Sequence, residues 1–360
     1  MLLITIIIKV PEISKAASDS KLSIHQIESN LPDVTLFVSM KNVEMESAQL
    51  KKKLRIKIND TPTKITNIQS VKKGNKVTEN TTYLVLVDTS VSMQTQNQLS
   101  ELQSLLENLL DYSQPNDKMA VFGVDDRIEI LKDYTVIDSS YNIVNAISRQ
   151  KEITSESGTY LYSGIREAYD MGRAAQDLPT RRIVVLITDG GVEGDCLSSG
   201  DLKHYMDVDR LPVYTLILNK QGPMEEEFKN AADQIAQKTG GQSFISKSGN
   251  ELFSQFRASM EQCIVIKLRC EKFKASAFNL QANMNVALIG EQEEISQTAK
   301  FTAAPIPIAN EPGQSGDNLR TSYFGVVVIM TPIILVLVIS FALLWFLNDK
   351  GKKHGSDENK

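Results

Sequence analysis

The stretch from Tyr83 to Ser92 reads YLVLVDTSVS, an apolar run of strand length that ends in an aspartate and two serines. Three later runs have the same character: MAVFGV (119–124), RIVVLITD (182–189) and VYTLIL (213–218). Continuous apolar runs are typical of parallel strands covered on both faces. Amphipathic helical segments alternate with them: LSELQSLLENLLDY (99–112), YSGIREAYDMGRAA (162–175) and EEEFKNAADQIAQKTGG (225–241). This order predicts an α/β domain over residues 81–261, with a doubly wound, mostly parallel sheet.

Five oxygen-bearing side chains follow these strands, at the edge where doubly wound sheets bind ligands. They are Asp88, Ser90 and Ser92 after the first run, Thr159 ahead of a helix, and Asp189 at the end of the third run. Any one of them alone is explained as a helix cap or a turn residue. Together they offer a hard divalent cation an incomplete oxygen cage that water completes. The sequence therefore predicts a Mg²⁺ site, with Mn²⁺ as the alternative ion.

These residues resemble the von Willebrand factor type A family, in domains that carry a metal-ion-dependent adhesion site. The family pattern D-x-S-x-S, then threonine, then aspartate is matched in full by Asp88, Ser90, Ser92, Thr159 and Asp189. The resemblance implies that the three hydroxyls are metal ligands, and that the two aspartates ligate directly or hold metal-bound water. It also implies that the ion binds a carboxylate of another protein. The acidic loop GGVEGDC after Asp189 either tunes partner choice or is a solvated loop.

Strand patterns also flank the α/β domain on both sides. The N-terminal segment, 21–80, contains VTLFVSM (34–40), LRIKIND (54–60) and KITNIQS (64–70), and the C-terminal segment, 262–303, contains CIVIKLRC (263–270), FNLQANMNVALIG (278–290) and ISQTAKFTA (295–303). Neither flank alone buries enough surface for comfortable stability. We expect residues from about 30 to 78 and 262 to 303 to pair into one β-sandwich interrupted by the α/β domain, which resembles the arrangement of the integrin β chain. Two independent hairpin modules are the alternative.

The two ends of the chain predict a membrane protein. Residues 323–347 contain an uncharged apolar run from Phe324 to Leu347, long enough for a transmembrane helix. Lysines follow this run, which places residues 348–360 in the cytoplasm and the rest outside. The proline- and glycine-rich segment 304–322 is expected to be a flexible stalk. The first 20 residues begin with MLLITIII, which favours a signal peptide, with a first β-strand as the alternative.

Composition excludes several other functions. The net charge is -5, and no basic cluster interleaved with aromatic residues is present in the part expected to be soluble, so nucleic acid is not an expected partner. The three histidines, His25, His204 and His354, are far apart in the sequence, and no activated nucleophile is identifiable. Three cysteines are too few for a disulfide scaffold, and Cys263 and Cys270 are expected not to bridge each other. We do not expect an enzyme.

These observations predict a single-pass surface protein whose exported domain binds an acidic protein ligand through Mg²⁺. The main alternative is an envelope assembly or secretion accessory subunit that docks a membrane partner through the same site. A metal-dependent hydrolase is the least favoured interpretation.

Overall fold

The computed structural model describes residues 21–41, 43, 45–73, 76–77, 79–136, 158–174, 178–192, 194–219, 226–271, 280–290 and 294–303. These residues belong to one compact unit within 1–306. The expected signal peptide (1–20), stalk (304–322), transmembrane helix (323–347) and tail (348–360) lie outside the described residues. Among the residues that are described, no helix has the length and apolar character needed to cross a membrane.

The α/β domain is built on a six-stranded mixed sheet with the order β10-β9-β8-β11-β12-β13. All neighbours pair in parallel except β10, which is antiparallel to β9 at one edge. The strands are β8 (Thr81–Asp88), β9 (Lys118–Val124), β10 (Ile128–Val136), β11 (Arg181–Thr188), β12 (Val213–Leu218) and β13 (Ser243–Ser246). The structure thus has the mixed α/β sheet that the sequence predicts.

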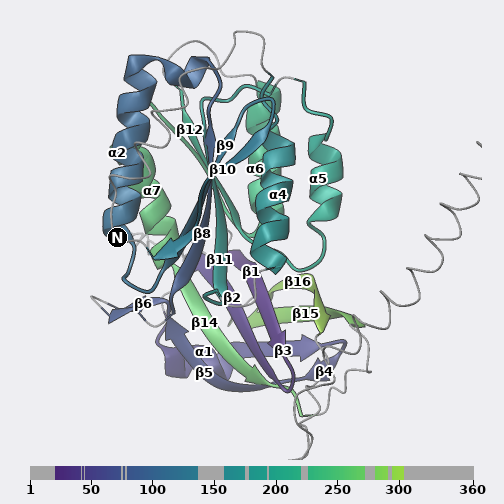
Figure 1. Cartoon of the computed structure of the whole chain (residues 1–360). Helices are drawn as coiled ribbons and strands as arrows, with labels where there is room; N and C mark the ends of the chain where they lie inside the picture. Colours follow the sequence, from purple (N-terminus) through teal and green to yellow (C-terminus); the bar gives the residue numbers. More distant parts are fainter. Residues whose placement is uncertain are drawn as a thin grey trace, which may run out of the picture. The chain divides into compact units, whose positions relative to one another are not determined.

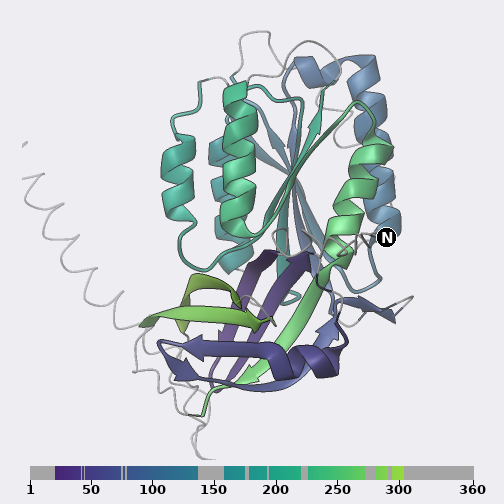
Figure 2. The same cartoon turned by 180° about the vertical axis from the view of Figure 1, so that it is seen from behind.

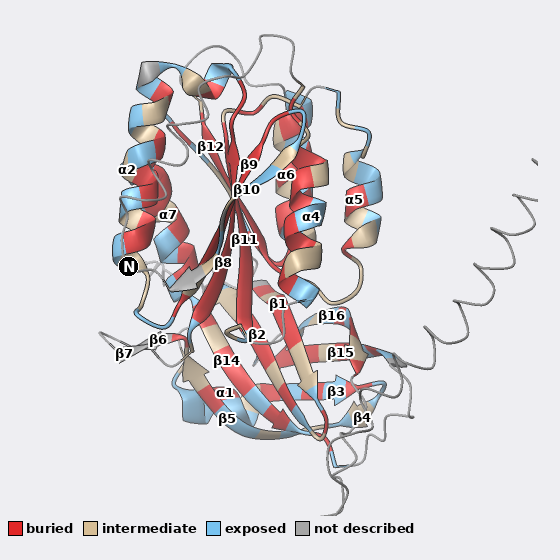
Figure 3. Ribbon diagram, in the orientation of Figure 1, coloured by how far each residue is buried: buried red, intermediate tan, exposed pale blue. Residues whose placement is uncertain are grey.

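Helices cover both faces of this sheet (Figures 1 and 2). The face with Tyr83, Val85 and Val87 packs against α2 (Gln96–Tyr112) and α7 (Gly249–Glu261). The opposite face, with Leu84 and Leu86, packs against α4 (Leu161–Ala174), α5 (Ser199–Tyr205) and α6 (Glu226–Thr239). A short 3-10 helix, η2 (Ser92–Gln94), precedes α2. Every residue of β8 and β11 is buried, which explains why their sequences show no polar alternation (Figure 3).

The two flanks together form a second layered structure. One sheet has the order β1-β2-β14-β5 and the other β16-β15-β3-β4. Its elements are β1 (Lys21–Asn30), β2 (Asp33–Lys41), α1 (Ser47–Lys53), β3 (Leu54–Ile58), β4 (Thr61–Pro62), β5 (Lys64–Ser70), β14 (Cys263–Arg269), β15 (Leu280–Ile289) and β16 (Glu294–Ala303). Strands β6 (Lys72–Lys73) and β7 (Lys76–Val77) form a separate two-stranded ribbon. Strand β14 pairs with β2 and β5, and β15 pairs with β3, so strands from both flanks share each sheet.

One apolar core lies between these two sheets, with Ile24 and Leu36 from one and Met284 and Phe301 from the other. The pairing agrees with the expected sandwich and not with two independent hairpin modules. The sandwich begins earlier than residue 30, because β1 contributes Ile24 to this core. Cys196, Cys263 and Cys270 are free thiols, and Cys263 and Cys270 lie in different apolar clusters.

Buried polar contacts join the sandwich to the α/β domain at the start of β11. A register shift in β1 lies between Ile24 and Gln26, and such bulges redirect side chains. The Gln26 amide donates to the Thr180 carbonyl at 2.7 Å and accepts the Arg182 N–H at 2.9 Å. On β16, the Thr302 hydroxyl donates to the Asp209 carboxylate at 2.6 Å. The Gln26 contacts fix the amino-terminal end of β11 against the sandwich, and the Thr302 contact fixes the segment before β12.

His25 lies next to Gln26, and its environment predicts that the fold loses stability in acid. Its Nε2 lies 2.7 Å from the Ser39 hydroxyl, and burial together with the positive charge of Arg181 lowers the pKa of His25 to about 3. Below pH ~6.5, His25 is therefore protonated in the unfolded chain but stays neutral in the folded chain. Stability contributed by neutral His25 is complete above that pH and is lost as the pH falls toward about 3.

We predict that His25→Gln flattens this pH dependence. Between pH ~7 and ~4.5 the wild-type chain should lose roughly 2–3 kcal/mol more unfolding free energy than the variant. Urea unfolding followed by circular dichroism at several pH values measures the difference. His204→Gln is the matched control, because the His204 side chain is 89% exposed. Parallel pH profiles of wild type and His25→Gln would contradict the prediction.

Candidate metal centre

The candidate centre lies where the parallel strands β8 and β11 end side by side. Their register pairs Val87 with Ile187, so Asp88 at the end of β8 adjoins Thr188 at the end of β11. Because both strands run in the same direction, their carboxyl ends deliver polar side chains to one edge of the sheet. Asp189 follows Thr188 in a turn in which Gly190 has φ 107°, a backbone conformation that favours glycine. The Gly190 N–H donates to the Thr188 hydroxyl at 3.0 Å.

Asp88 is the most deeply buried residue of the five predicted for this site, with 1% of its surface exposed. Its Oδ1 accepts the Ser90 backbone N–H at 2.9 Å, and its Oδ2 accepts the Thr188 hydroxyl at 2.6 Å. Burial raises the pKa of Asp88 to about 6, although the hydrogen bonds from Ser90 and Thr188 oppose the rise. The two bonds fix the orientation of the carboxylate while each oxygen keeps a further lone pair.

The loop after β8 keeps Ser90 buried and carries Ser92 to the surface. Ser90 is 8% exposed, Ser92 is exposed, and their hydroxyl oxygens lie 3.1 Å apart. A backbone hydrogen bond within the loop fixes its turn: the Met93 N–H donates to the Ser90 carbonyl at 3.1 Å. Asp189 is half-buried; burial raises its pKa, and a hydrogen bond with Ser92 opposes the rise. Asp88, Ser90, Ser92 and Asp189 are therefore brought together as the sequence predicts.

Thr159 reaches this edge by a different route. It is 5% exposed and stands just before α4. The Tyr160 N–H donates to the Asp125 carbonyl at 2.8 Å, and the Thr89 N–H donates to the Val124 carbonyl at 2.9 Å. Thr159 is thus placed through the end of β9, next to the loop that carries the serines. The hydrogen bonds described at this edge do not join Thr159 directly to the other four predicted residues.

Two residues that sequence reasoning did not select help to form the site. Thr188 fixes the Asp88 carboxylate, and its signal was a hydroxyl directly before Asp189 at a strand end. Asp125 follows β9, and its Oδ2 lies 3.5 Å from the Thr89 hydroxyl, while its Oδ1 accepts the Arg127 N–H at 2.9 Å. An acidic residue directly after the apolar run 119–124 was the available signal for Asp125.

Asp195, in the acidic loop after Asp189, has a local structural role. Its carboxylate accepts the Ser163 N–H at 3.0 Å and the Ser163 hydroxyl at 2.6 Å, at the start of α4. A further bond at 3.0 Å comes from the Leu197 N–H. The two bonds from Ser163 satisfy donors in the first turn of α4, which is a capping function. Glu193, in the same loop, lies outside the described residues.

The donor set at this edge fits a hard divalent cation. In an octahedral Mg²⁺ shell with bonds of about 2.1 Å, neighbouring ligands lie about 3 Å apart, close to the 3.1 Å between the Ser90 and Ser92 hydroxyls. Across the described ranges, no group of three or more His, Cys, Asp or Glu side chains could hold a metal ion. An ion here would therefore depend on the hydroxyls, on the two aspartates and on water.

The buried charge of Asp88 gives a prediction that needs no metal. Since its pKa is raised from 3.8 to about 6, ionised Asp88 costs roughly 3 kcal/mol of stability above that pH. The neutral isostere Asp88→Asn should therefore stabilise the metal-free chain by about 1–3 kcal/mol at pH ~7.5 in chelator, measured by urea unfolding. Asp111→Asn, at an exposed position of α2, is the control and should change little. Destabilisation by Asp88→Asn would show that its hydrogen bonds outweigh its desolvation.

Comparison with known families gives one match, which lies within the α/β domain. Residues 83–192 match the family profile described as von Willebrand factor type A domain. A search of curated proteins found no match.

Three solved structures illustrate the similarity to known folds. A von Willebrand factor type A protein from Catenulispora acidiphila is 9% identical, with 81% of this chain and 74% of that chain covered and a TM-score of 0.41. A mutant of the PilB minor pilin from Streptococcus sanguinis is 11% identical, with 68% of this chain and 78% of that chain covered and a TM-score of 0.41. The ArnB paralog VWA2 from Sulfolobus acidocaldarius is 14% identical, with 79% and 76% covered and a TM-score of 0.40.

The profile match runs from β8 to just beyond β11, and it includes all five predicted site residues. The α/β domain is therefore similar to von Willebrand factor type A domains over residues 83–192.

Proposed function

We propose that this chain is a membrane-anchored binding protein whose A-type domain captures a carboxylate of a protein ligand through a divalent cation. The observation that carries the proposal is the graded exposure of the donor set. Asp88 is buried, Asp189 is half-buried and Ser92 is exposed. A cation held by such a set has protein oxygens on its inner side and water on its outer side. A carboxylate from another protein is a hard oxygen ligand that replaces such a water.

The expected roles of the side chains follow from this geometry together with the family resemblance. Ser90, Ser92 and Thr159 would supply hydroxyl ligands, and Asp88 and Asp189 would ligate directly or hold metal-bound water. Mg²⁺ is the proposed ion, with Mn²⁺ as the alternative. Thr188 would keep the Asp88 carboxylate oriented, because its hydroxyl donates to Oδ2. An ion would also relieve the charge repulsion that Asp189 exerts on Asp88.

We also propose binding without catalysis. His25 is buried in the β-sandwich, and His204 lies on α5 with its side chain toward solvent, so neither stands beside the candidate centre as a general base. A type A domain is in keeping with a protein-interaction module. The alternative role, an accessory subunit that docks a membrane partner, uses the same site and differs only in where the partner resides.

The proposed location is a cell membrane crossed once. The uncharged run 324–347 would form the span, and Lys350, Lys352 and Lys353 would keep the C-terminus in the cytoplasm. The A-type domain would then face the outside. This topology makes the site accessible to ligands on other cells, in the matrix or in the same membrane.

We predict that the full chain in detergent binds one Mg²⁺ or Mn²⁺, measured by isothermal titration calorimetry. At a free ion concentration of about 100 times Kd, binding should stabilise the fold by roughly 2.7 kcal/mol and raise the melting temperature. Asp88→Asn should abolish both the heat of binding and the ion-dependent rise. Asp111→Asn, at its exposed position on α2, should behave as wild type. Ion uptake that survives Asp88→Asn would place the metal elsewhere.

We further predict that partner capture depends on the ion. Proteins retained by the immobilised full chain in Mg²⁺ should be released by chelator and should not be retained by Asp88→Asn. Asp111→Asn should retain them. Esterification of the partner's carboxyl groups should prevent capture, because it removes the negative charge by which a carboxylate binds a divalent cation. Capture that withstands both chelator and esterification would refute a metal-bridged carboxylate.

A further inference from the structure

A dense group of cations lies on the β-sandwich, in the segment from α1 to β5. Residues 51–64 contain one aspartate and six basic side chains: Lys51, Lys52, Lys53, Arg55, Lys57 and Lys64. All of the six are exposed except Lys53, which is half-buried. Among the ion pairs of the described residues, none involves any of these six side chains. A chain with a net charge of -5 thus carries a local positive surface.

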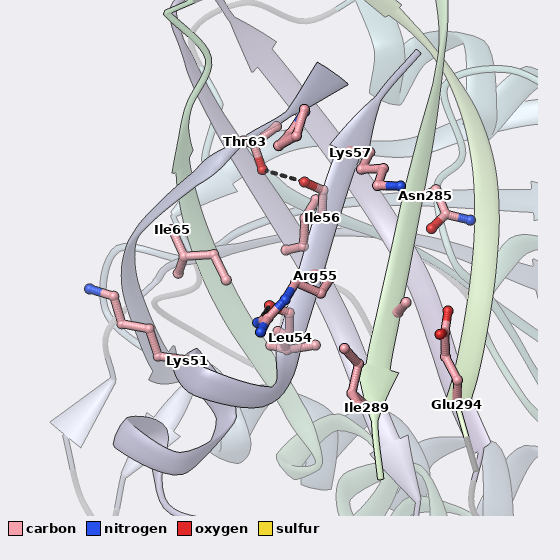
Figure 4. A pocket seen from close by; sticks show the side chains of 12 residues that line it. Lys51, Leu54, Arg55, Ile56, Lys57, Thr63, Ile65, Asn285, Ile289 and Glu294 are labelled. Atoms are coloured by element: carbon pink, nitrogen blue, oxygen red, sulfur yellow. Dashed lines mark hydrogen bonds between the residues drawn. The ribbon is translucent and has the colours of Figure 1, made fainter. Parts of the chain in front are cut away.

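Three of these cations line a cavity of about 540 Å³ beside β3 (Figure 4). We call this cavity the basic groove. Lys51 comes from α1, and Arg55 and Lys57 come from β3. Apolar side chains complete the lining, among them Ile65 and Ile289, the latter 39% exposed. Glu294 is the only carboxylate that lines it among the described residues. The groove therefore combines excess positive charge with accessible apolar surface.

Arg55 is held in place before any ligand arrives. Its guanidinium donates to the Lys52 carbonyl at 2.6 Å and to the Leu54 carbonyl at 3.0 Å, near the end of α1. These two bonds use one nitrogen and leave other N–H donors of the guanidinium free. Lys51 makes only a 3.4 Å contact with the Thr66 carbonyl. The groove thus presents one fixed and several adjustable donors, a set suited to phosphate oxygens.

We propose that the basic groove binds anionic phospholipid headgroups of the membrane in which the chain is anchored, an inference that rests on the proposed membrane anchor. Lysine and arginine side chains that come near an anionic lipid surface are attracted to its headgroups. The long lysine and arginine stems lie along apolar surface while their charges meet phosphate, and Ile289 contacts the interfacial layer. An acidic protein segment would match the charge but would gain less from the exposed isoleucine.

The connection between the sandwich and the predicted span is long enough for this contact. Strand β16 ends at Ala303, and the predicted span begins at residue 323. The roughly 20 residues between them reach at most about 70 Å when extended and average about 25 Å as a flexible chain. The sandwich is therefore kept at a high effective concentration next to the bilayer surface.

Contact through the basic groove would also orient the metal centre. Strand β11 begins next to Gln26 of the sandwich and ends at Thr188 beside Asp88, a rise of roughly 23 Å. The groove is on the sandwich and the candidate centre is at the opposite end of the α/β sheet (Figures 1 and 2). A sandwich seated on the bilayer through α1 and β3 turns the site away from the membrane, toward an external ligand.

The experiment compares lysine accessibility in two kinds of lipid nanodisc. The full chain is reconstituted in discs of phosphatidylcholine alone or with about 30% phosphatidylglycerol. Amine acetylation is then quantified by mass spectrometry at about 50 mM and about 500 mM NaCl. We expect Lys51, Lys52 and Lys57 to react about threefold more slowly in anionic discs at low salt only. Lys247, an exposed lysine after β13 of the α/β domain, is the internal control and should react equally in both.

A double variant tests whether the groove itself causes the protection. Lys51→Gln with Lys57→Gln should restore fast acetylation of Lys52 in anionic discs, whereas Lys229→Gln with Lys247→Gln should leave its protection intact. Arg55 is unchanged in both variants, so its bonds to α1 remain. Circular dichroism confirms that each variant is folded.

Three outcomes would overturn the proposal, and one would implicate the anchor instead. Acetylation in both discs that is as fast as in the detergent-solubilised chain refutes lipid binding. Acetylation in both discs that is equally slower than in detergent indicates coverage by protein. Protection of the detergent-solubilised chain by polyglutamate, with none in anionic discs, assigns the groove to an acidic protein segment. Failure of the chain to float with the discs counts against the membrane anchor itself, so the two failures are distinguishable.

Discussion

The parallel pairing of β8 with β11 is the constraint on which the rest of the structure depends. Because Val87 and Ile187 are in register, a buried carboxylate on one strand meets a hydroxyl on the other, 100 residues away. Both strands are buried along their whole length, so a shift in register would require repacking both helical layers. At its amino-terminal end, β11 is hydrogen-bonded to Gln26 of the sandwich. One rigid strand thus connects the candidate metal site to the flanking domain.

The sequence predicted the strands and four side chains that lie together at the candidate site, but not the contacts that orient them. Continuous apolar runs marked β8 and β11, and the residues that follow them predicted four side chains that do come together. Thr188 contacts Asp88 only because β11 is the neighbour of β8 in the sheet. Strand order is set by tertiary packing, so local sequence did not predict this contact. In the same way Asp195 caps α4 across 32 residues, and local sequence does not encode that partner.

The start of the sandwich was missed for a different physical reason. Strand β1 does not keep a strict alternation, because its register shifts between Ile24 and Gln26. Buried apolar side chains at Leu22 and Ile24 are followed by buried polar ones at His25 and Gln26. Such a pattern does not resemble a strand with one face in a core. This register shift has a structural role, because it turns the Gln26 amide toward the backbone at the start of β11.

The inserted arrangement also determines how a load at the metal site would reach the rest of the chain. The α/β domain is connected to the sandwich twice, before β8 and after α7, and only Gln262 separates α7 from β14. Strand β14 lies between β2 and β5 in its sheet, so tension that arrives through α7 is borne by backbone hydrogen bonds on both sides. The Gln26 amide adds a non-covalent connection at the start of β11, and the Thr302 hydroxyl adds another at Asp209, before β12. A domain held by two chain connections and by these hydrogen bonds transmits force to the sandwich without swinging freely.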